Sequence, residues 1–469
     1  MKNLKSKITL LFLGFVTLQS CNKIKDFGDT NVNPGAISTP ATYAILTGVE
    51  TGISGWATFN GPALWIQYQS ETQYPGTGLY AVPTFGFGTY TGSLLNLKTI
   101  IDANSNADEV AVARILTQYI YFHMTNCLGN IPYSEALKGF TPKFDKQEDI
   151  YKGMIAELKA AKAQFINSGS LKGDILNNGN VDKWKKFANS LRAMMAIQLS
   201  KRYPAPGGYA ATQFAAAIAD GVITSNADNI QLNFPPTGSD YRNPYWVNND
   251  GGRDNGESTQ IFGMLSTLGD GRQAAFGSSN VAVPHGLSEA NINVWIKNNI
   301  NWSRILAPNQ RLEKSPIFML TASELYMARA EAAEIGWTAE DKTAMYNAGI
   351  AANFAQWNLP APAPGYYTQS SVALNGTNNL KKIAEQAYLS AFPNGLAGWN
   401  IWRRTGYPVL IPAPAPLNAA HVVPPRRYTF TASEYSLTPV GVLSSIGALV
   451  PAGTNQATDL QESRIWWDQ

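Results

Sequence analysis

The sequence predicts a mostly α-helical protein in which degenerate helix pairs form a scaffold that carries a long, loop-rich region. Three observations support this fold class. Apolar residues recur at helical spacing in several separate segments, strand-like runs are few and short, and a glycine-containing turn joins two of the helical segments. A chain of 469 residues can bury a sizeable core in one large domain or two.

The first predicted helices lie between residues 109 and 199. Residues 109–126 have helical character, and a second stripe runs from Ile150 to Phe165. Asp145, with Glu148 three residues later, predicts a capping box at the start of that second helix. A third stripe carries Trp184, Phe187, Ala188, Leu191, Met194, Met195 and Leu199, and Pro204 ends it. We expect Trp184, Phe187 and Leu191 to pack in the core.

A second group of predicted helices begins at a capping box formed by Thr321 and Glu324. This helix extends to Ile335, Gly336 ends it, and residues 338–341 open the next helix, which reaches Phe354. Residues 380–392 also have helical character. A helix, a short turn and a second helix form the unit of helical repeats, but no clean 34-residue period is present, so the repeats are degenerate.

Two regions lack this helical pattern. Between about 225 and 315 the sequence is dominated by asparagine, glycine, proline and aromatic residues. The stretch from about 405 to 469 is also irregular, and its PAPAP segment at 412–416 predicts a stiff, extended connector. Loops of this length in a compact protein are usually functional, so we expect the ligand site here or in a similar loop.

The amino terminus has the pattern of a secretion signal. Three lysines, at positions 2, 5 and 7, precede an apolar run from Ile8 to Val16 that is too short to cross a bilayer as a helix. Leu18 and Ser20 then precede Cys21, an arrangement that resembles a bacterial lipobox. The resemblance implies that residues 1–20 are a lipoprotein signal peptide and that Cys21 is the acylated first residue of a mature chain 21–469, anchored to a membrane by its lipid.

Charge and cysteine content exclude several classes of protein. Removing the three signal lysines lowers the formal charge from +3 to zero, and no basic run is present, so we expect no nucleic-acid partner. With Cys21 acylated, Cys127 is a solitary thiol and no intramolecular disulfide forms. Charged residues make up 15% of the chain, against about 25% in typical soluble proteins, which predicts a large core, aromatic surface for a ligand, or both.

Three aromatic clusters in loops are the candidate ligand site. Sugars present C–H faces that stack on aromatic rings, and hydroxyls that need amide and carboxylate partners. The alternative for each ring is that it holds a loop against the helices. The clusters are Tyr68, Tyr74, Tyr80, Phe85, Phe87 and Tyr90 among glycines; Tyr241, Tyr245 and Trp246 followed by Asn248, Asn249 and Asp250; and Trp295 and Trp302 with Asn298, Asn299 and Arg304.

The sequence contains few residues in patterns suited to catalysis or metal binding. The three histidines, His123, His285 and His421, are scattered, which disfavours a Ser-His-Asp triad or a histidine-rich zinc site. Asp250, Asp254 and Glu257 invite comparison with a glycosidase carboxylate pair, but we interpret them as a solvated or turn-stabilising group. Residues 248–258 do not match a calcium-binding loop, and no phosphate-binding or dinucleotide motif is present, so we predict neither a metal nor a cofactor.

Several long stretches, taken together, resemble one family. They are NCLGNIPYSEAL (126–137), PKFDKQEDIYKGMIAELKAA (142–161), GNVDKWKKFANSLRAMMAIQLSKR (179–202), PIFMLTASELYMARAEAAEIGW (316–337), GWNIWRRTGYPVL (398–410), VPPRRYTFTASEY (423–435) and RIWWDQ (464–469). In order and spacing they resemble the SusD/RagB-like nutrient-binding outer-membrane lipoproteins of Bacteroidota, in the SusD-like 2 subgroup. The resemblance covers essentially the whole mature chain.

This resemblance implies a mostly α fold with four tetratricopeptide-like helix pairs beside a loop-rich region that bears the ligand site. It also implies a cell-surface protein without catalysis that binds an oligosaccharide or another nutrient, such as a peptide, and delivers it to a SusC-like TonB-dependent transporter. A surface-anchored glycan hydrolase and a scaffold that binds only protein are the alternatives. Within the same segments, we expect Arg403 and Arg404 to pair with carboxylates such as Asp182 or Glu385, and Trp466 and Trp467 to dock the chain end.

Overall fold

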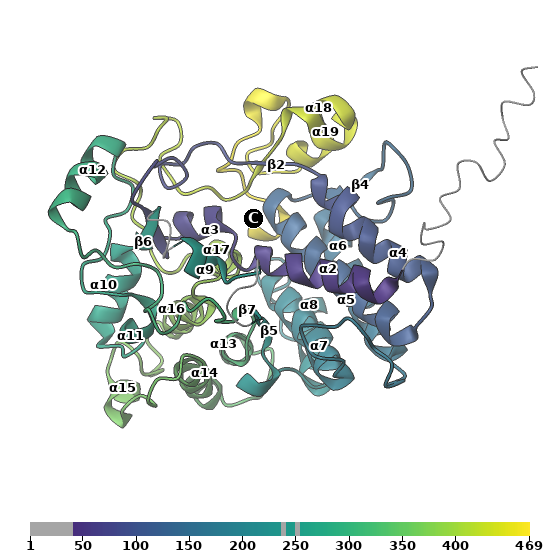
Figure 1. Ribbon diagram of the computed structural model, residues 1–469, viewed down its shortest axis with the longest axis horizontal. Helices are drawn as coiled ribbons and strands as arrows, with labels where there is room; N and C mark the ends of the chain where they lie inside the picture. Colours follow the sequence, from purple (N-terminus) through teal and green to yellow (C-terminus); the bar gives the residue numbers. More distant parts are fainter. Residues whose placement is uncertain (1–40, 236–240, 249–253) are drawn as a thin grey trace, which may run out of the picture. The chain divides into compact units, whose positions relative to one another are not determined.

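A computed structural model describes residues 41–235, 241–248 and 254–469 of the chain (Figure 1). Helices dominate this part of the chain, as the sequence predicts. They are α2 (Thr42–Ile53), α3 (Asn60–Trp65), α4 (Leu95–Ala103), α5 (Ala107–Leu128), α6 (Gln147–Gln164), α7 (Val181–Gln198), α8 (Tyr209–Ala219), α9 (Pro244–Trp246), α10 (Thr259–Leu268), α11 (Gln273–Phe276), α12 (Glu289–Asn298), α13 (Ala322–Glu334), α14 (Lys342–Gln356), α15 (Pro364–Thr368), α16 (Asn379–Ala391), α17 (Gly395–Thr405), α18 (Ala432–Leu437) and α19 (Pro439–Gly447).

The described strands are short and form four two-stranded pairs. β1 (Gln69–Glu71) runs antiparallel to β6 (Asn255–Glu257), and β2 (Thr84–Phe85) runs parallel to β8 (Thr429–Phe430). β3 (Ile131–Pro132) and β4 (Phe144–Asp145) are antiparallel, as are β5 (Ile230–Leu232) and β7 (Ile317–Leu320). Three of these pairs join segments far apart in the sequence, so they tie the loops to the helical scaffold.

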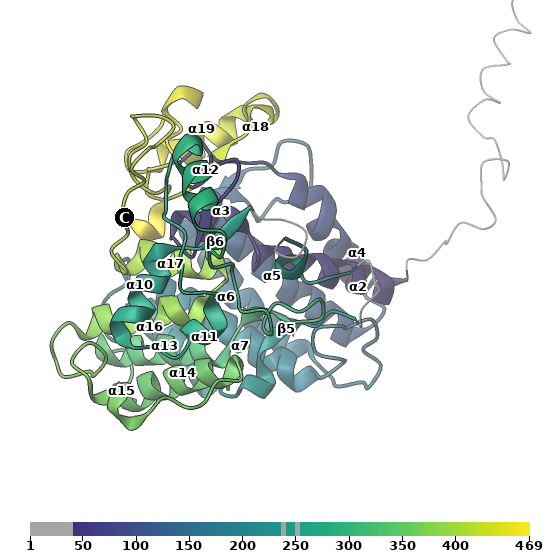
Figure 2. The ribbon, with the colours of Figure 1, turned by 60° about the vertical axis from the view of Figure 1, so that its left-hand side comes forward.

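Consecutive helices pack against each other to form the scaffold. Among consecutive helices, the pairs with the most extensive contacts are α5 with α6, α6 with α7, α7 with α8, and α13 with α14. α13 also contacts α16 and α7, and thereby joins the two groups of helices (Figure 2). This arrangement confirms the predicted tetratricopeptide-like helix pairs. No helix in the described ranges has the length and apolar character needed to cross a membrane.

One of the two predicted capping boxes is confirmed and the other is wrong. At the start of α13, Thr321 Oγ1 accepts the Glu324 N–H at 3.3 Å, and Glu324 Oε2 accepts the Thr321 N–H at 2.9 Å. At the start of α6 the N-cap residue is Lys146, and no side chain caps the helix. The Asp145 carboxylate instead accepts the backbone N–H groups of Tyr133 and Ser134. The Asp145 side chain therefore makes tertiary hydrogen bonds to the segment that follows β3, and it does not cap α6.

The predicted core residues Trp184, Phe187 and Leu191 are buried, which confirms the stripe on α7. The carboxyl terminus also docks as predicted, because Trp467 is fully buried and its indole N–H donates to Asn126 Oδ1 at 2.8 Å. Cys127, the cysteine among the described residues, is a free, buried thiol. Cys21 lies outside the described residues.

The predicted partners of Arg403 and Arg404 are wrong. Arg404 pairs with Glu331 on α13. The Arg403 guanidinium lies over the rings of Trp399, at 3.4 Å, and Trp467, at 4.7 Å, and it donates to Asn126 O and Asn400 Oδ1. The carboxylates expected to pair with them, Asp182 and Glu385, contact exposed lysines on their own helices instead. Both arginines are buried where α17 meets its neighbours, so only groups on those surfaces reach them.

The region 225–315 contains more regular structure than its composition predicts. α10 and α12 lie within it, together with the short helices α9 and α11. The C-terminal stretch likewise contains α18 and α19. α12 packs its Ile292 against Val283 and Trp302 in a small apolar cluster of its own, so this region has a local core.

Candidate functional site

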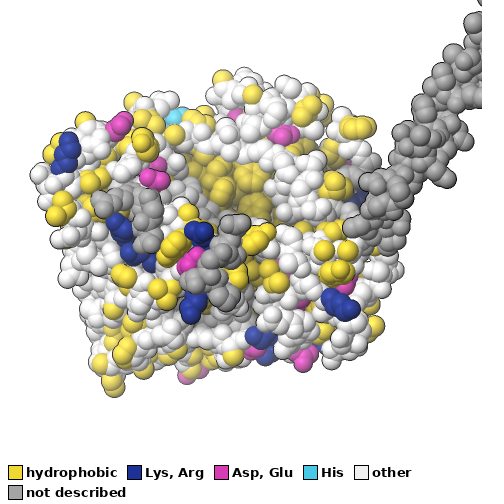
Figure 3. All heavy atoms as spheres, viewed as in Figure 1, with side chains coloured by type: hydrophobic (Ala, Val, Ile, Leu, Met, Phe, Trp, Pro, Cys, Tyr) yellow, Lys and Arg dark blue, Asp and Glu magenta, His cyan; other side chains and the backbone are white. Residues whose placement is uncertain are grey.

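Three aromatic rings that are neither buried nor fully exposed gather on one face of the structure. Trp56, in the short helix Ser54–Trp56, Phe59, just before α3, and Phe85, on β2, have ring centroids 6.0 to 6.4 Å apart. Figure 3 shows hydrophobic side chains gathered in a hollow in the part of the view where Figure 1 labels α3 and β2. We call the group Trp56, Phe59 and Phe85 the aromatic hollow.

Two buried rings lie against the aromatic hollow. The His123 imidazole stacks on Trp56 at 5.5 Å with an angle of 14° between the ring planes, and Tyr428 stacks on Phe59 at 5.5 Å and 19°. His123 belongs to α5, while Tyr428 directly precedes β8, the parallel partner of β2. The long helix α5 and the β2–β8 pair therefore hold the partly exposed rings in place from within the core.

Polar groups lie next to the aromatic hollow. Asn60 follows Phe59 directly and is exposed, and its Oδ1 accepts a hydrogen bond from Asn255 Nδ2 on β6 at 3.3 Å. Nearby on β1, the Glu71 carboxylate accepts the N–H groups of Gly76, Thr77 and Gly78, which orders the turn that follows Tyr74. Aromatic rings beside amides are the groups that a sugar requires, since C–H faces stack on the rings and hydroxyls bond to the amides.

His123 has an unusual environment for a histidine so close to a surface. It is buried, and neither ring nitrogen has a hydrogen-bond partner among the described residues. Burial lowers the pKa of His123 to about 3, so the imidazole is neutral at all ordinary pH values and presents a flat, uncharged ring to Trp56. Its role here is to support the indole.

This environment predicts an acid-dependent loss of stability. Because the folded pKa of His123 lies below the unfolded value of about 6.5, its contribution is fully present above pH 6.5 and is lost as the pH falls toward 3, at up to about 1.4 kcal/mol per pH unit. The free energy of unfolding of His123→Phe should therefore fall less than that of the wild type between pH 7 and pH 4, as measured by urea titration. Parallel curves would contradict the assigned burial.

The first predicted aromatic cluster is split by the fold. Tyr68 and Tyr80 are fully buried: the Tyr68 hydroxyl donates to Tyr388 O, and the Tyr80 hydroxyl accepts the Ala413 N–H at 2.9 Å. Tyr90 is buried and donates to Pro132 O, and Phe87 packs against Phe144 and Phe430. The three tyrosine rings therefore pack in the protein interior, and Phe87 packs partly exposed against the core. Tyr74, with 81% of its surface exposed, and Phe85 in the aromatic hollow remain available to a ligand.

The second and third clusters are also divided between core and surface. Tyr245 is buried and Trp246 is partly exposed, both held by Asn243, whose Oδ1 accepts their N–H groups. Tyr241 is 59% exposed. Asn249 and Asp250 lie outside the described residues. Trp302 is buried in the α12 cluster, and Trp295 packs partly exposed against that cluster.

The sequence reasoning missed Trp56, Phe59 and His123. A signal was present in the stretch GISGWATFNGP (52–62), which has the same mixture of glycine, aromatic and asparagine residues as the clusters that were chosen. No helical stripe is predicted on either side of this stretch, so the sequence does not show which elements flank its rings. His123 gave no local signal, since its role depends on a ring brought from another segment.

The geometry gives less support to a catalytic carboxylate pair or a metal site. Glu257 on β6 is fully buried, and its carboxylate accepts the Ser303 hydroxyl at 2.6 Å and Gln273 Nε2 at 3.1 Å. Burial raises the pKa of Glu257 to about 7. Asp254 is exposed, and Asp250 lies outside the described residues. Within the described ranges, no group of three or more His, Cys, Asp or Glu residues is placed to hold a metal ion.

Comparison with known families identifies the chain. A SusD-like family model, described as starch-binding and associating with the outer membrane, matches residues 29–431. The chain belongs to this SusD-like family. Family membership makes it a relative of nutrient- and glycan-binding proteins associated with the outer membrane, which agrees with the resemblance seen in the sequence.

Solved structures show the same fold. A chitin-binding SusD homologue from Flavobacterium johnsoniae is 23% identical, with a TM-score of 0.75 over 91% of this chain and 97% of that one. SusD homologues from Bacteroides fragilis (21% identity, TM-score 0.78, 91% of this chain and 100% of that one) and Bacteroides uniformis (22%, 0.76, 92% and 100%) are equally similar. At these identities the likeness establishes the SusD-like fold alone. Comparison with curated proteins gives no match.

Proposed function

We propose that this SusD-like protein is a lipid-anchored, cell-surface binding protein that captures an oligosaccharide and delivers it to a SusC-like TonB-dependent transporter. The observation that carries the ligand class is the aromatic hollow with Asn60 and Asn255 beside it. The anchor through Cys21, the surface location and the transporter partner rest on the lipobox-like amino terminus and on the family. Tyr74, Tyr241 and Trp246, which reach solvent elsewhere on the protein, are further candidates for ligand contact.

Binding without catalysis fits the geometry better than hydrolysis does. A glycosidase needs two carboxyl groups that reach opposite sides of a glycosidic bond. Glu257 is enclosed and hydrogen-bonded to Ser303 and Gln273, so it does not face a ligand at the surface. The three rings of the aromatic hollow, by contrast, offer stacking area without any group that moves a proton.

The test is ligand binding by a Trp56→Ala variant. Maltoheptaose and chitohexaose serve as neutral probes, and isothermal titration calorimetry measures their affinity. Because Trp56 supplies the largest ring of the hollow and His123 already supports it, its removal should weaken the tighter probe roughly ten-fold, about 1.4 kcal/mol.

Tyr43→Ala is the matched control, because Tyr43 is an exposed aromatic residue on α2 outside the aromatic hollow. It should bind as the wild type does. Equal affinity of the Trp56→Ala variant and the wild type would remove the hollow from the site. New reducing ends after incubation of the wild type with either probe would overturn the binding function in favour of hydrolysis.

A further inference from the structure

Glu257, on β6, is a buried carboxyl group that the proposed binding surface does not use. Its side chain is fully enclosed. Two residues earlier on the same strand, Asn255 donates to Asn60 beside the aromatic hollow. β6 lies beside α3 in both ribbon views (Figure 1, Figure 2). A change at Glu257 therefore acts on the strand that carries a polar group of the candidate ligand site.

Oxygen Oε2 of Glu257 accepts two hydrogen bonds, from Ser303 Oγ at 2.6 Å and from Gln273 Nε2 at 3.1 Å. An amide nitrogen only donates. The Ser303 hydroxyl has both lone pairs occupied, because it accepts the N–H groups of Ser278 and Ser279 at 2.9 and 3.2 Å. Its single hydrogen is therefore directed at Glu257. Both contacts make Oε2 an acceptor, so a proton on this carboxyl group is carried by Oε1.

The Oε1 atoms of Glu257 and Gln273 both lack donors. Both atoms are buried, and neither has a hydrogen-bond partner among the described residues. The two side chains already meet through Gln273 Nε2 and Glu257 Oε2. A carboxylate oxygen and an amide oxygen are both acceptors, so an ionised Glu257 leaves two buried acceptors without a hydrogen. A proton on Glu257 Oε1 supplies the missing donor, and the carboxylic acid and the amide then form a ring closed by two hydrogen bonds.

Several segments meet at the Glu257 side chain. Its backbone N–H donates to Ser303 O at 2.8 Å, and its carbonyl accepts the Val283 N–H at 2.8 Å. On β1, Gln69 lies opposite Glu257 in the strand register. A Cβ atom at Gly277 would overlap Glu257 Oε2, so the backbone itself closes over the carboxyl group. Through this side chain, β6 is attached to α11 and to the segments 277–283 and 302–304.

The charged groups on these segments do not compensate an ionised Glu257. Burial raises the pKa of Glu257 to about 7, although the Ser303 and Gln273 hydrogen bonds lower it. Segment 277–283 and α10 carry no titratable side chain. The charged groups on the other segments have other surroundings: Glu71 on β1 accepts the N–H groups of Gly76 and Gly78, Arg272 pairs with Asp270, Arg304 lies over the Trp302 ring at 5.5 Å, and Asp254 before β6 is exposed.

We propose that Glu257, Gln273 and Ser303 form a proton-dependent latch, closed by neutral Glu257, that holds β6 and its Asn255 in place beside the aromatic hollow. When the Oε1 proton passes to water, the bond to Gln273 Oε1 is lost and a buried carboxylate without a counter-charge remains. The latch then opens, because a charged carboxylate is far more costly to bury than a neutral one. The effect on ligand affinity rests on the function proposed for the hollow, whereas the proton on Glu257 does not.

Acid closes the latch and alkali opens it. The pKa of Glu257 in the folded protein, about 7, lies above its ordinary value of 4.5. The stability that the latch contributes is therefore fully present below pH 4.5 and is lost as the pH rises through 7. Ligand affinity at the hollow should follow the same course, since the closed latch holds Asn255.

Infrared difference spectroscopy between pH 6 and pH 8.5 tests the proton directly. The wild type should lose a C=O band of a protonated carboxyl group that is absent from the Glu257→Gln variant. Glutamine has the shape of neutral glutamic acid and donates to Gln273 Oε1 through its own amide, so this variant keeps the latch closed at every pH. Glu324→Gln is the matched control, because Glu324 is a second buried glutamate whose pKa burial raises to about 7. This control should keep the Glu257 band.

Two further measurements follow the opening of the latch between pH 6 and pH 8.5. The protection of the Glu257 N–H against hydrogen exchange, corrected for the intrinsic exchange rate, should fall about three-fold in the wild type. The affinity for maltoheptaose or chitohexaose, measured by calorimetry, should fall by a similar factor. Both quantities should stay constant in Glu257→Gln, whereas Glu324→Gln should behave as the wild type does.

The outcomes separate the latch from the function proposed for the hollow. A wild type without the band, or a Glu257→Gln variant that keeps it, would overturn the assigned proton. Equal loss of exchange protection in these two proteins would overturn the latch. A probe that binds the wild type equally at both pH values would overturn the link between the latch and the hollow. If exchange protection changes as expected but neither probe binds at pH 6, the latch is supported and the function proposed for the hollow fails.

Discussion

Asp270→Asn is expected to lower the free energy of unfolding by about 3–5 kcal/mol, because it leaves a buried guanidinium without its counter-charge. The Asp270 carboxylate accepts Arg272 Nε at 3.0 Å and Nη2 at 2.6 Å, and both side chains are fully enclosed. Burial by itself would raise the pKa of Asp270, but the Arg272 charge and its hydrogen bonds hold that pKa below the usual value. The carboxylate is therefore ionised at neutral pH.

The size of this effect follows from the position of the pair. Arg272 also donates to Asn353 on α14 and to Gln386 on α16, while Asp270 joins α10 to α11. The pair thus links the loop-rich region to two scaffold helices. Urea unfolding followed by circular dichroism measures the change, and Asp182→Asn is the control, because Asp182 is 81% exposed at the start of α7 and should change stability by less than about 0.5 kcal/mol. A loss below about 1 kcal/mol for Asp270→Asn would contradict this account.

Trp467→Ala is expected to cost a similar 3–5 kcal/mol, because it removes a fully buried indole close to the end of the chain. The ring packs against the Arg403 guanidinium at 4.7 Å, and its N–H donates to Asn126 Oδ1 on α5. Its loss opens a cavity and removes one of the two donors to Asn126 Oδ1, which keeps the Tyr151 hydroxyl at 2.6 Å.

The neighbouring Trp466 supplies the control for this prediction. Trp466 is partly exposed and packs beside Tyr203, with Arg202 over its ring, so Trp466→Ala should cost clearly less. Thermal and urea unfolding of the two variants measure the difference. Equal losses would mean that the chain end contributes only general contact area, and not the specific packing of Trp467 on Arg403.

Features of this chain that depend on neighbouring residues are predictable from its sequence, whereas those that depend on distant segments are not. The helix stripes and the Thr321–Glu324 capping box were predicted correctly because each depends on residues within a few positions of one another. The Asp145 capping box and the arginine pairs were wrong because another segment competes for the same group. Asp145 is taken by the backbone of Tyr133 and Ser134, and Arg404 by Glu331 on α13.

In the candidate site, the sequence shows the chemistry of the residues but not their burial. The chemistry, aromatic rings beside amides, was recognisable in the sequence, and Phe85 and Tyr74 were among the rings that it singled out. The burial of individual rings was not recognisable in the sequence. Tyr68, Tyr80 and Tyr90 resemble their exposed neighbours in the sequence, yet they lie in the core. A tyrosine suits either environment, since its ring is apolar and its hydroxyl needs only one buried acceptor.

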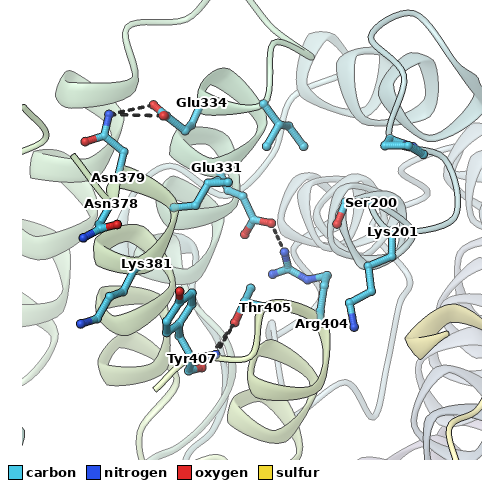
Figure 4. Close-up of a pocket in the computed structure, with 13 residues that line it drawn as sticks. Ser200, Lys201, Glu331, Glu334, Asn378, Asn379, Lys381, Arg404, Thr405 and Tyr407 are labelled. Atoms are coloured by element: carbon cyan, nitrogen blue, oxygen red, sulfur yellow. Dashed lines mark hydrogen bonds and ion pairs between the residues drawn. The ribbon is translucent and has the colours of Figure 1, made fainter. Parts of the chain in front are cut away.

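The sequence alone predicts the helical scaffold, the few short strands, the membership of the SusD-like family and a lipid-anchored amino terminus. Which aromatic rings reach solvent depends on the packing of the folded chain. Trp56, Phe85 and His123 come from three separate segments that meet through the packing of α5 and the pairing of β2 with β8. The pocket lined by the ends of α7, α13 and α17 and the start of α16 is also a tertiary feature (Figure 4). Local periodicity records which face of a helix is buried, whereas a binding surface depends on contacts between distant segments, and a single sequence does not record those contacts.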